Sequence, residues 1–236
     1  MSDSQNLSDP ELRRYAGQIS LQEVGLSGQE KLKNIRVAVV GAGGLGTVVL
    51  QYLAAIGIGH IGIIDYSLVD ELNIQRQVLY GGNDLGKLKT IISKQQLQNL
   101  FPLISFEIIN IQLTSGNMER ILAPFQLIVD ATNNETSHTL LCEACEKLKF
   151  PLVYGVVTGF KGEVGVIDST KDTSQGRFKL RNNDGAENRK GNISLTFGFI
   201  GNLMAFEVFK VLTGNDSALV NKFMIVDLLS YQFSVK

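Results

Sequence analysis

A run of β-branched and small apolar residues leads directly into a glycine-rich loop, and this junction constrains the fold more than any other part of the sequence. Residues 37–40 predict a buried strand, and residues 47–56 predict a helix. Gly41, Gly43 and Gly46 between them have the spacing Gly-x-Gly-x-x-Gly. Because strand, glycines and helix agree, the junction predicts a nucleotide-binding turn rather than a tight turn without a ligand.

Each glycine has its own physical role at such a turn. Gly41 would permit the tight turn, Gly43 would let backbone amides approach a phosphate, and Gly46 would let the helix pack closely. The N-terminus of the following helix attracts anionic oxygens. A second apolar run, residues 61–64, ends in Asp65, nineteen residues after Gly46. This is near the spacing at which an acid accepts hydrogen bonds from ribose hydroxyls.

The alternation of predicted elements indicates an α/β fold. Residues 1–34 predict two short helices, the first opened by the capping box of Ser8 and Glu11. Strands and helices alternate over residues 35–157, which predicts a Rossmann-like, mostly parallel sheet with helices on both faces. Residues 158–236 predict C-terminal antiparallel strands, a mobile loop at about 169–191 and a long apolar helix.

The composition and net charge of the chain exclude some classes of function. With 236 residues, 44% of them hydrophobic, the chain can bury a substantial core, and we expect one domain over 1–236. A net charge of −1 gives no general attraction to nucleic acid or to a membrane surface. We expect no apolar run to approach the length of a membrane span, and the polar residues 1–5 lack a signal-peptide core. We therefore expect a cytoplasmic protein.

Two further predictions concern helices. Asp84 is predicted to cap a long helix with Lys87 and Lys89 in its first turns, where positive charge opposes the helix dipole. A lysine there indicates either an anionic partner or a solvated surface position. Gly198 and Gly201 predict close packing of the long apolar helix against another backbone.

Cys142 and Cys145 form a Cys-x-x-Cys motif, with His138 one helical turn earlier. A metal site would need a further ligand from elsewhere, and the only other histidine is His60. Core packing of three side chains on one helix face is therefore the preferred interpretation.

Several ordered motifs together resemble the ThiF/MoeB/HesA family, the bacterial relatives of ubiquitin-activating enzymes, over about residues 14–233. The motifs are Arg14-Tyr15 with Gln18-Ile19, residues 28–32, the glycine loop, residues 73–77, Gly86 with Lys89, and residues 151–153. The resemblance implies a homodimer that binds ATP and Mg²⁺. It also implies adenylation of the C-terminal glycine of a small ubiquitin-like sulfur carrier protein ending in Gly-Gly, of the thiamine or molybdopterin type.

The resemblance also implies particular site residues. The implied nucleotide-binding residues are Gly41, Gly43, Gly44, Gly46, Asp65, Asn73, Arg76, Lys89, Asp130, Asn133 and Asn134. Asp65 would hold the ribose, and Asn73 would face the phosphates. Arg76 and Lys89 would be the catalytic residues, because transfer to a carboxylate depends mainly on alignment and charge neutralisation. Arg76 can fork onto two oxygens, whereas Lys89 acts as a point charge.

Two positions depart from the family pattern. Asn133 stands where the family usually has an aspartate that binds Mg²⁺, so we expect a weaker Mg²⁺ site. Gly17 stands where the family usually has an arginine that reaches the neighbouring subunit's site. Arg13 or Arg14, on the same helix face, is our candidate to replace it.

Cysteine motifs of some family members are missing. No Cys-x-x-Cys pair occurs in the loop at 169–191 or at the C-terminus, so we expect no structural zinc. Residues 187–189 replace the cysteine that many members carry before the long helix, which argues against a thioester or persulfide relay there.

Three functions remain open at this point. The first is an ATP-dependent adenylyltransferase, favoured because Arg76 and Lys89 are retained. The second is a catalytically weakened scaffold that binds nucleotide or a carrier protein, suggested by Gly17 and Asn133. The third is an NAD-dependent oxidoreductase, which the glycine loop and Asp65 alone would allow.

Overall fold

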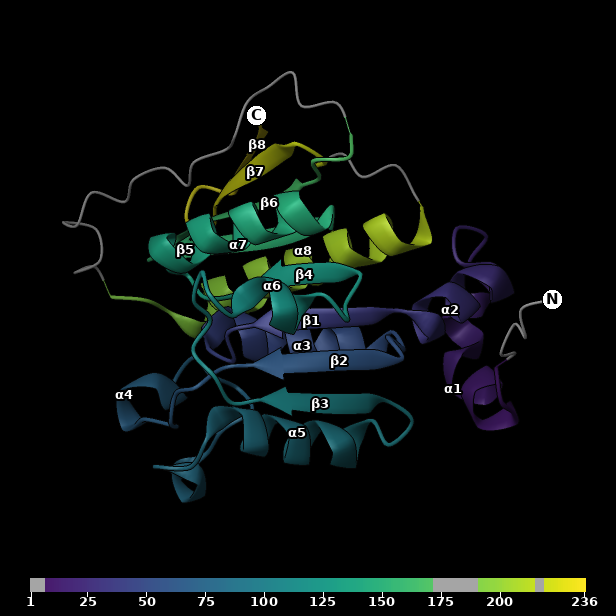
Figure 1. Ribbon diagram of the computed structural model, residues 1–236, viewed down its shortest axis with the longest axis horizontal. Coiled ribbons are helices and arrows are strands. Elements are labelled where there is room, and N and C mark those ends of the chain that lie inside the picture. Colours follow the sequence, from purple (N-terminus) through teal and green to yellow (C-terminus); the bar gives the residue numbers. More distant parts are fainter. Residues whose placement is uncertain (1–6, 172–190, 215–218) are drawn as a thin grey trace.

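The computed structural model describes residues 7–171, 191–214 and 219–236, and within these ranges the chain forms an eight-stranded sheet (Figure 1). The strands are β1 (Arg36–Val40), β2 (His60–Ile64), β3 (Ser105–Ile109), β4 (Leu127–Asp130), β5 (Leu152–Thr158), β6 (Lys161–Ile167), β7 (Lys222–Asp227) and β8 (Gln232–Val235). Their order is β3-β2-β1-β4-β5-β6-β7-β8. The first five pair in parallel and the last three continue antiparallel from β5, which confirms the predicted fold class.

Helices cover both faces of this sheet (Figure 1). They are α1 (Asp9–Ile19), α2 (Gly25–Asn34), α3 (Gly44–Ala55), α4 (Glu71–Ile74), η1 (Gly82–Asp84), α5 (Lys89–Leu100), α6 (Met118–Leu122), α7 (Glu135–Leu148) and α8 (Ser194–Thr213). One core lies between the sheet and α3, α5 and α8, and a second lies between the opposite face and α6 and α7. Consecutive residues of β1, such as Val39 and Val40, enter different cores because strand side chains alternate in direction.

The two N-terminal helices pack together at the end of α3 that is farthest from the glycine loop. The backbone N–H of Ser8 donates to Glu11 Oε2 at 2.7 Å, which closes the predicted capping box of α1. The side-chain amides of Gln18 and Gln29 both donate to the carbonyl oxygen of Ile56, at 2.8 and 3.0 Å. These bonds satisfy a carbonyl group at the C-terminus of α3 that has no partner within the helix.

Helix α8 corrects the expectation that no apolar run is long enough for a membrane span. By length and composition alone this helix of 20 residues could cross a membrane. It packs against α3, β5 and β6, and a Cβ on Gly201 would lie 2.8 Å from Val48 Cβ. Burial against the sheet accounts for its apolar character, since core helices share this composition. The predicted close contact at Gly198 is wrong, because a Cβ there would have no neighbour within 4 Å.

The helix expected to begin at Asp84 begins instead at Lys89. Gly86 has φ of +75°, which interrupts helical geometry, and Asp84 Oδ2 accepts a hydrogen bond from the backbone N–H of Gly81 at 3.0 Å. The backbone N–H of Lys89 then donates to Ser67 O at 3.1 Å. This connection places Lys89 at the very start of α5, next to the end of β2.

The predicted loop at about 169–191 falls mainly on residues 172–190, which lie outside the described residues, as do residues 187–189.

Candidate active site

A cavity of about 600 Å³ opens at the carboxyl ends of the parallel strands. Most of the site residues predicted from sequence line it, namely Gly41, Gly43, Gly44, Asp65, Asn73, Arg76, Lys89, Asn133 and Asn134. The crevice at this end of an open α/β sheet is the usual place for a ligand. A volume of this size lies within the range of about 300–1,000 Å³ that is typical of small-molecule sites.

The glycine loop forms one wall of the cavity. Gly41 has φ of +94°, and a Cβ there would lie 2.9 Å from Ala131 O on the adjacent loop. Gly46 does not line the cavity, and a Cβ on it would overlap the carbonyl oxygen of Gly41. At Gly43 a Cβ would have only an ordinary contact, 3.8 Å from Gln77 Nε2. The loop backbone at Gly43 is therefore accessible from the cavity, whereas Gly41 and Gly46 make the turn itself tight.

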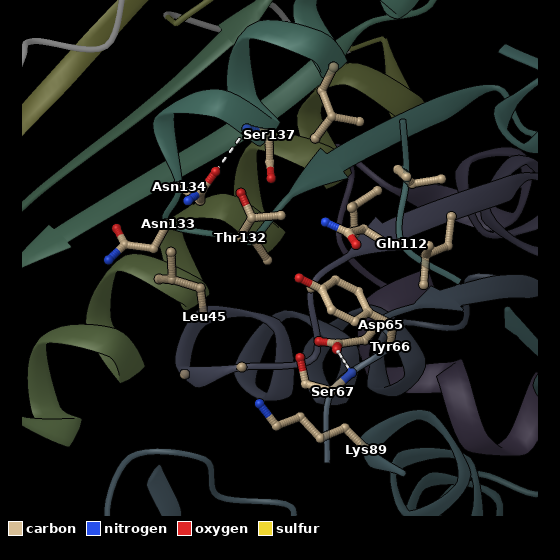
Figure 2. A pocket seen from close by; sticks show the side chains of 18 of the residues that line it. Leu45, Asp65, Tyr66, Ser67, Lys89, Gln112, Thr132, Asn133, Asn134 and Ser137 are labelled. Carbon is tan, nitrogen blue, oxygen red and sulfur yellow. Dashed lines mark hydrogen bonds between the residues drawn. The ribbon is translucent and has the colours of Figure 1, made fainter. Parts of the chain in front are cut away.

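Asp65, at the end of β2, is fixed beside the glycine loop. Its Oδ2 atom accepts a hydrogen bond from the backbone N–H of Ala42 at 2.7 Å, and its Oδ1 atom accepts one from that of Ser67 at 2.7 Å (Figure 2). A carboxylate has about four acceptor positions, so each oxygen retains capacity for a further donor. The arrangement orients Asp65 to accept hydroxyl groups of a ligand in the cavity.

Lys89 lines the cavity from the start of α5, and Figure 2 shows its side chain beside Ser67 and Asp65 with the ammonium group directed into the cavity. The side chain is 7% exposed and makes no ion pair with any residue in the described ranges. Burial lowers the pKa of Lys89, the charge of Arg76 lowers it further, and Asp65 and Asp70 oppose this shift. A buried cation without a carboxylate partner is costly, so this position suits an anionic ligand.

Arg76 lines the same cavity from the turn that follows α4. Its guanidinium group donates to Leu72 O at 3.1 Å and to Asn73 Oδ1, and it lies 5.9 Å from the centre of the Phe197 ring. Phe197 also closes the space beside Gly44, where a Cβ would lie 2.7 Å from the ring. Asn73 and Phe197 thus hold the guanidinium beside the start of α3.

Gln77 is a site residue that the sequence did not single out, although it belongs to the polar cluster at 73–77. It is 4% exposed, lines the cavity, and its buried Oε1 atom has no hydrogen-bond partner within the described part of the chain. An unpaired buried polar atom costs about 1–3 kcal/mol, so it is usually explained by a ligand or ordered water. Thr132, Ser137 and Gln112 also line the cavity, and none of them was predicted as a site residue.

Asp130 does not line the cavity. It is 3% exposed; its Oδ1 atom accepts hydrogen bonds from the backbone N–H and the hydroxyl of Thr132, at 3.0 and 2.7 Å. Its Oδ2 atom lies 2.9 Å from His138 Nδ1. Asp130 therefore supports the loop at residues 131–134 from beneath, and the loop, rather than the carboxylate, faces the cavity.

Asn133 and Asn134 use their side chains within the protein. Asn133 Oδ1 accepts a hydrogen bond from the backbone N–H of Val157 at 2.9 Å, and Asn133 Nδ2 donates to Val157 O at 3.3 Å. Asn134 caps α7 by accepting from the backbone N–H of Ser137 at 2.9 Å (Figure 2). Among the described residues there is no group of three His, Cys, Asp or Glu side chains that could hold a metal ion.

Arg13 and Arg14 lie on α1, far from this chain's own cavity. Helix α1 packs at the C-terminal end of α3, whereas the cavity lies at its N-terminal end. The 12 residues of α3 separate these ends, which is about 18 Å at a rise of about 1.5 Å per residue. Neither arginine is therefore brought to the cavity within one chain.

Comparison with known proteins shows the family to which this chain belongs. Residues 15–236 match the ThiF family. The chain belongs to the ThiF family. A sulfur carrier protein adenylyltransferase of Thermus thermophilus is 38% identical over 232 residues, covering 94% of this chain and 86% of the relative. A probable molybdopterin-synthase adenylyltransferase of Porphyra purpurea is 37% identical, but this match covers 89% of the chain and only 56% of the relative.

Solved structures agree on the fold of this ThiF-family chain. Crystalline PaaA superposes with a TM-score of 0.83 at 25% identity, covering 100% of this chain and 77% of PaaA. The structure of E. coli MccB with MccA superposes with a TM-score of 0.82 at 20% identity, covering 98% of this chain and 72% of MccB. Both match the helical N-terminus as well as the sheet, given this coverage.

Proposed function

We propose that the protein is an ATP-dependent adenylyltransferase that activates the C-terminal glycine carboxylate of a small ubiquitin-like sulfur carrier protein. The names of the Thermus and Porphyra relatives support this reaction class. The observation that carries the proposal is the position of Lys89 and Arg76. The two residues come from separate elements and line one cavity together with the accessible glycine loop. Within the described ranges Lys89 makes no ion pair with a carboxylate.

The chemistry needs alignment and charge neutralisation rather than proton transfer. The substrate carboxylate is already ionised at neutral pH, so it needs no general base before it attacks the α-phosphorus of ATP. As the new bond forms, the bond to the leaving pyrophosphate breaks and negative charge builds on the phosphate oxygens. Lys89 neutralises this charge as a point cation, and Arg76 offers two parallel donors. The amides at the start of α3 bind phosphate oxygens, and Asp65 accepts the ribose hydroxyls.

Mg²⁺ would supply further charge neutralisation on the phosphates when bound. This chain's own residues do not fit a dedicated site for it, because neither Asn133 nor the neighbouring Asp130 brings a carboxylate to the cavity. Asn133 Oδ1 accepts from Val157, and Asp130 is buried beneath the loop. We therefore propose that the ion enters with ATP and is held mainly by phosphate oxygens.

We further propose that the enzyme works as a homodimer. The position of Arg13 and Arg14, one helix length from their own cavity, supports a role only in a neighbouring subunit's site. The test is an Arg13→Ala, Arg14→Ala double variant. If it forms adenylate as fast as the parent protein, neither arginine replaces the guanidinium that Gly17 does not provide.

ATP–pyrophosphate exchange tests the proposed reaction directly. Candidate carrier proteins ending in Gly-Gly are added one at a time, and exchange should appear only with a suitable carrier. The Lys89→Ala variant should lower the rate about 10²–10³-fold, the usual effect of removing one donor that stabilises transition-state charge. Exchange that persists in this variant would reveal a contaminating enzyme.

A catalytically weakened scaffold is the second candidate, and Gly17 and Asn133 are the residues that favour it. It predicts nucleotide or carrier binding in calorimetry without exchange for any carrier. An NAD-dependent oxidoreductase predicts tight NAD binding without ATP binding in the same measurement. The buried Lys89 favours a triphosphate over NAD, because hydride transfer has no need of such a cation.

A further inference from the structure

A chain of three hydrogen-bonded side chains connects Cys142, a partly buried cysteine, to the floor of the cavity. His138 Nδ1 lies 2.9 Å from Asp130 Oδ2, and His138 Nε2 lies 3.4 Å from Cys142 Sγ. His138 and Cys142 are one turn apart on α7, and Asp130 ends β4. The order cysteine, histidine, aspartate is the arrangement that activates a thiol nucleophile, with the carboxylate fixing the orientation of the imidazole ring.

The environment of His138 favours its charged form. Burial lowers the pKa of His138, but hydrogen bonds to Asp130 and Cys142, together with the charges of these two groups, raise it more, to about 10. At neutral pH both ring nitrogens then carry hydrogen, so Nδ1–H donates to Asp130 and Nε2–H donates to Cys142 Sγ. The Tyr154 ring packs against the imidazole, with 4.9 Å between ring centres. His138 Nε2–H is thereby placed to donate to Cys142 Sγ, and the thiolate is the form of a cysteine that attacks peroxides.

The neighbouring Cys145 provides a contrast on the same helix. It is 2% exposed, and burial raises the pKa of its thiol. Cys142, by contrast, is only partly buried and has an imidazolium partner. Cys145 is therefore the more buried of the two cysteines and serves as an internal control for the reactivity of Cys142.

We propose that Cys142 is a reactive thiol that a hydroperoxide converts to a sulfenic acid, and that this modification loosens the cavity loop at residues 131–134. The Cys142 thiolate attacks one peroxide oxygen, so an S–O bond forms while the O–O bond breaks. The leaving oxygen takes the proton from His138 Nε2 and departs as water or alcohol. The sulfur loses two electrons, and the peroxide gains them.

The coupling to the cavity follows from the hydrogen bonds on the far side of His138. In the oxidation step His138 gives up its Nε2 proton, so the imidazolium becomes a neutral imidazole, and the sulfur anion beside it is replaced by a neutral sulfenic acid. The hydrogen bond from Nδ1–H to Asp130 Oδ2 loses the charge of its donor and weakens, while the Oδ1 atom of Asp130 carries both hydrogen bonds to Thr132. Thr132, Asn133 and Asn134 line the cavity, so a shift of Asp130 reaches the site directly.

Thiol reactivity is measured first. The whole protein is treated with hydrogen peroxide at pH 7, sulfenic acid is trapped with dimedone, and the labelled peptides are quantified by mass spectrometry. Cys142 should react about tenfold or more faster than both Cys145 and free glutathione. A rate no higher than that of glutathione would overturn the proposal with the unmodified chain alone.

A matched variant isolates the contribution of the imidazole. In His138→Asn the side-chain amide can still donate to Asp130, but it is too short to reach Cys142 Sγ. Labelling of Cys142 should fall about tenfold while the melting temperature stays near that of the parent protein. Labelling that is unchanged in a folded His138→Asn variant would show that His138 does not activate the thiol.

Amide hydrogen exchange tests the coupling. After peroxide treatment, peptides that contain residues 130–138 should exchange faster, above all at the Thr132 amide that Asp130 Oδ1 holds. Treated Cys142→Ser protein is the control and should exchange at the untreated rate. Equal exchange before and after oxidation of Cys142 would overturn the coupling. Neither measurement involves a nucleotide, so both outcomes are independent of the proposed adenylyltransferase activity.

Discussion

Asn133 pairs with both backbone groups of Val157, accepting from its N–H at 2.9 Å and donating to its carbonyl oxygen at 3.3 Å. Only an amide can do both, because a carboxylate has no hydrogen to donate at neutral pH. The residue also has φ of +52°, a conformation that asparagine and aspartate tolerate better than most other residues. The structure thus accounts for asparagine at position 133 without reference to Mg²⁺.

The Asn133→Asp variant separates these two roles. It leaves the Val157 carbonyl oxygen without its donor, so we expect a loss of about 1–3 kcal/mol in the free energy of unfolding. The same change adds a carboxylate at the cavity, so half-maximal exchange activity should need less Mg²⁺. Urea unfolding and a Mg²⁺ titration of ATP–pyrophosphate exchange measure the two effects. An unchanged Mg²⁺ requirement would mean that the side chain stays with Val157 and does not reach the ion.

Arg76 is expected to need its guanidinium group and not only its charge. Arg76→Lys keeps the positive charge but loses the fork that Leu72 O and Asn73 Oδ1 orient. We expect kcat/KM for adenylation to fall about 10²-fold, because a point charge cannot give two aligned donors. Thermal unfolding checks that the variant is folded. Activity equal to that of the parent would assign Arg76 a general electrostatic role only.

The sequence predicted the elements that depend on local patterns and the residues that depend on motif spacing. The glycine loop, the capping box at Ser8 and the strand ending in Asp65 were located correctly because each has a short-range cause. The start of α5 was misplaced because Gly86 interrupts the helix and Lys89 N–H bonds instead to Ser67 O, a contact between distant segments. Local periodicity contains no information about such a contact.

The region around Cys142 and Cys145 also shows that local sequence patterns do not predict contacts between distant segments. The motif at Cys142 and Cys145 was interpreted as core packing, and Cys145 is indeed buried. Cys142 and His138 form a hydrogen-bonded chain with Asp130 rather than a simple core contact. Asp130 belongs to a different element and was expected to bind the cofactor instead. Helical spacing placed the thiol and the imidazole on one face, but only the tertiary structure shows which carboxylate meets them.

The two glycines of α8 make a matched pair for stability measurements. A Cβ at Gly198 would have no neighbour within 4 Å, so Gly198→Ala should stabilise the protein by about 0.5–1 kcal/mol through helix propensity. A Cβ at Gly201 would lie 2.8 Å from Val48 Cβ, so Gly201→Ala should destabilise it by about 1–3 kcal/mol through overpacking. Urea unfolding of both variants measures the difference. Equal effects would contradict the packing of α8 against α3.

The capping box of α1 should make stability depend on pH. Burial raises the pKa of Glu11, but hydrogen bonds from Lys33 and Ser8 lower it more, so the pKa lies below its ordinary value of 4.5. A carboxyl group whose pKa is lower in the folded state stabilises the protein above its unfolded pKa and loses this effect as pH falls through the folded pKa.

A Glu11→Gln variant isolates this contribution, because glutamine keeps the size of the side chain and loses its charge. The parent protein should be more stable than the variant at neutral pH by about 1 kcal/mol, the usual size of a capping interaction. The difference should shrink at acidic pH, as the pH falls through the lowered folded pKa of Glu11 and the carboxyl group becomes protonated. Urea unfolding of both proteins at neutral and at acidic pH measures it. If the difference were the same at both, the 2.8 Å contact between Lys33 Nζ and Glu11 Oε2 would contribute no charge-dependent stability.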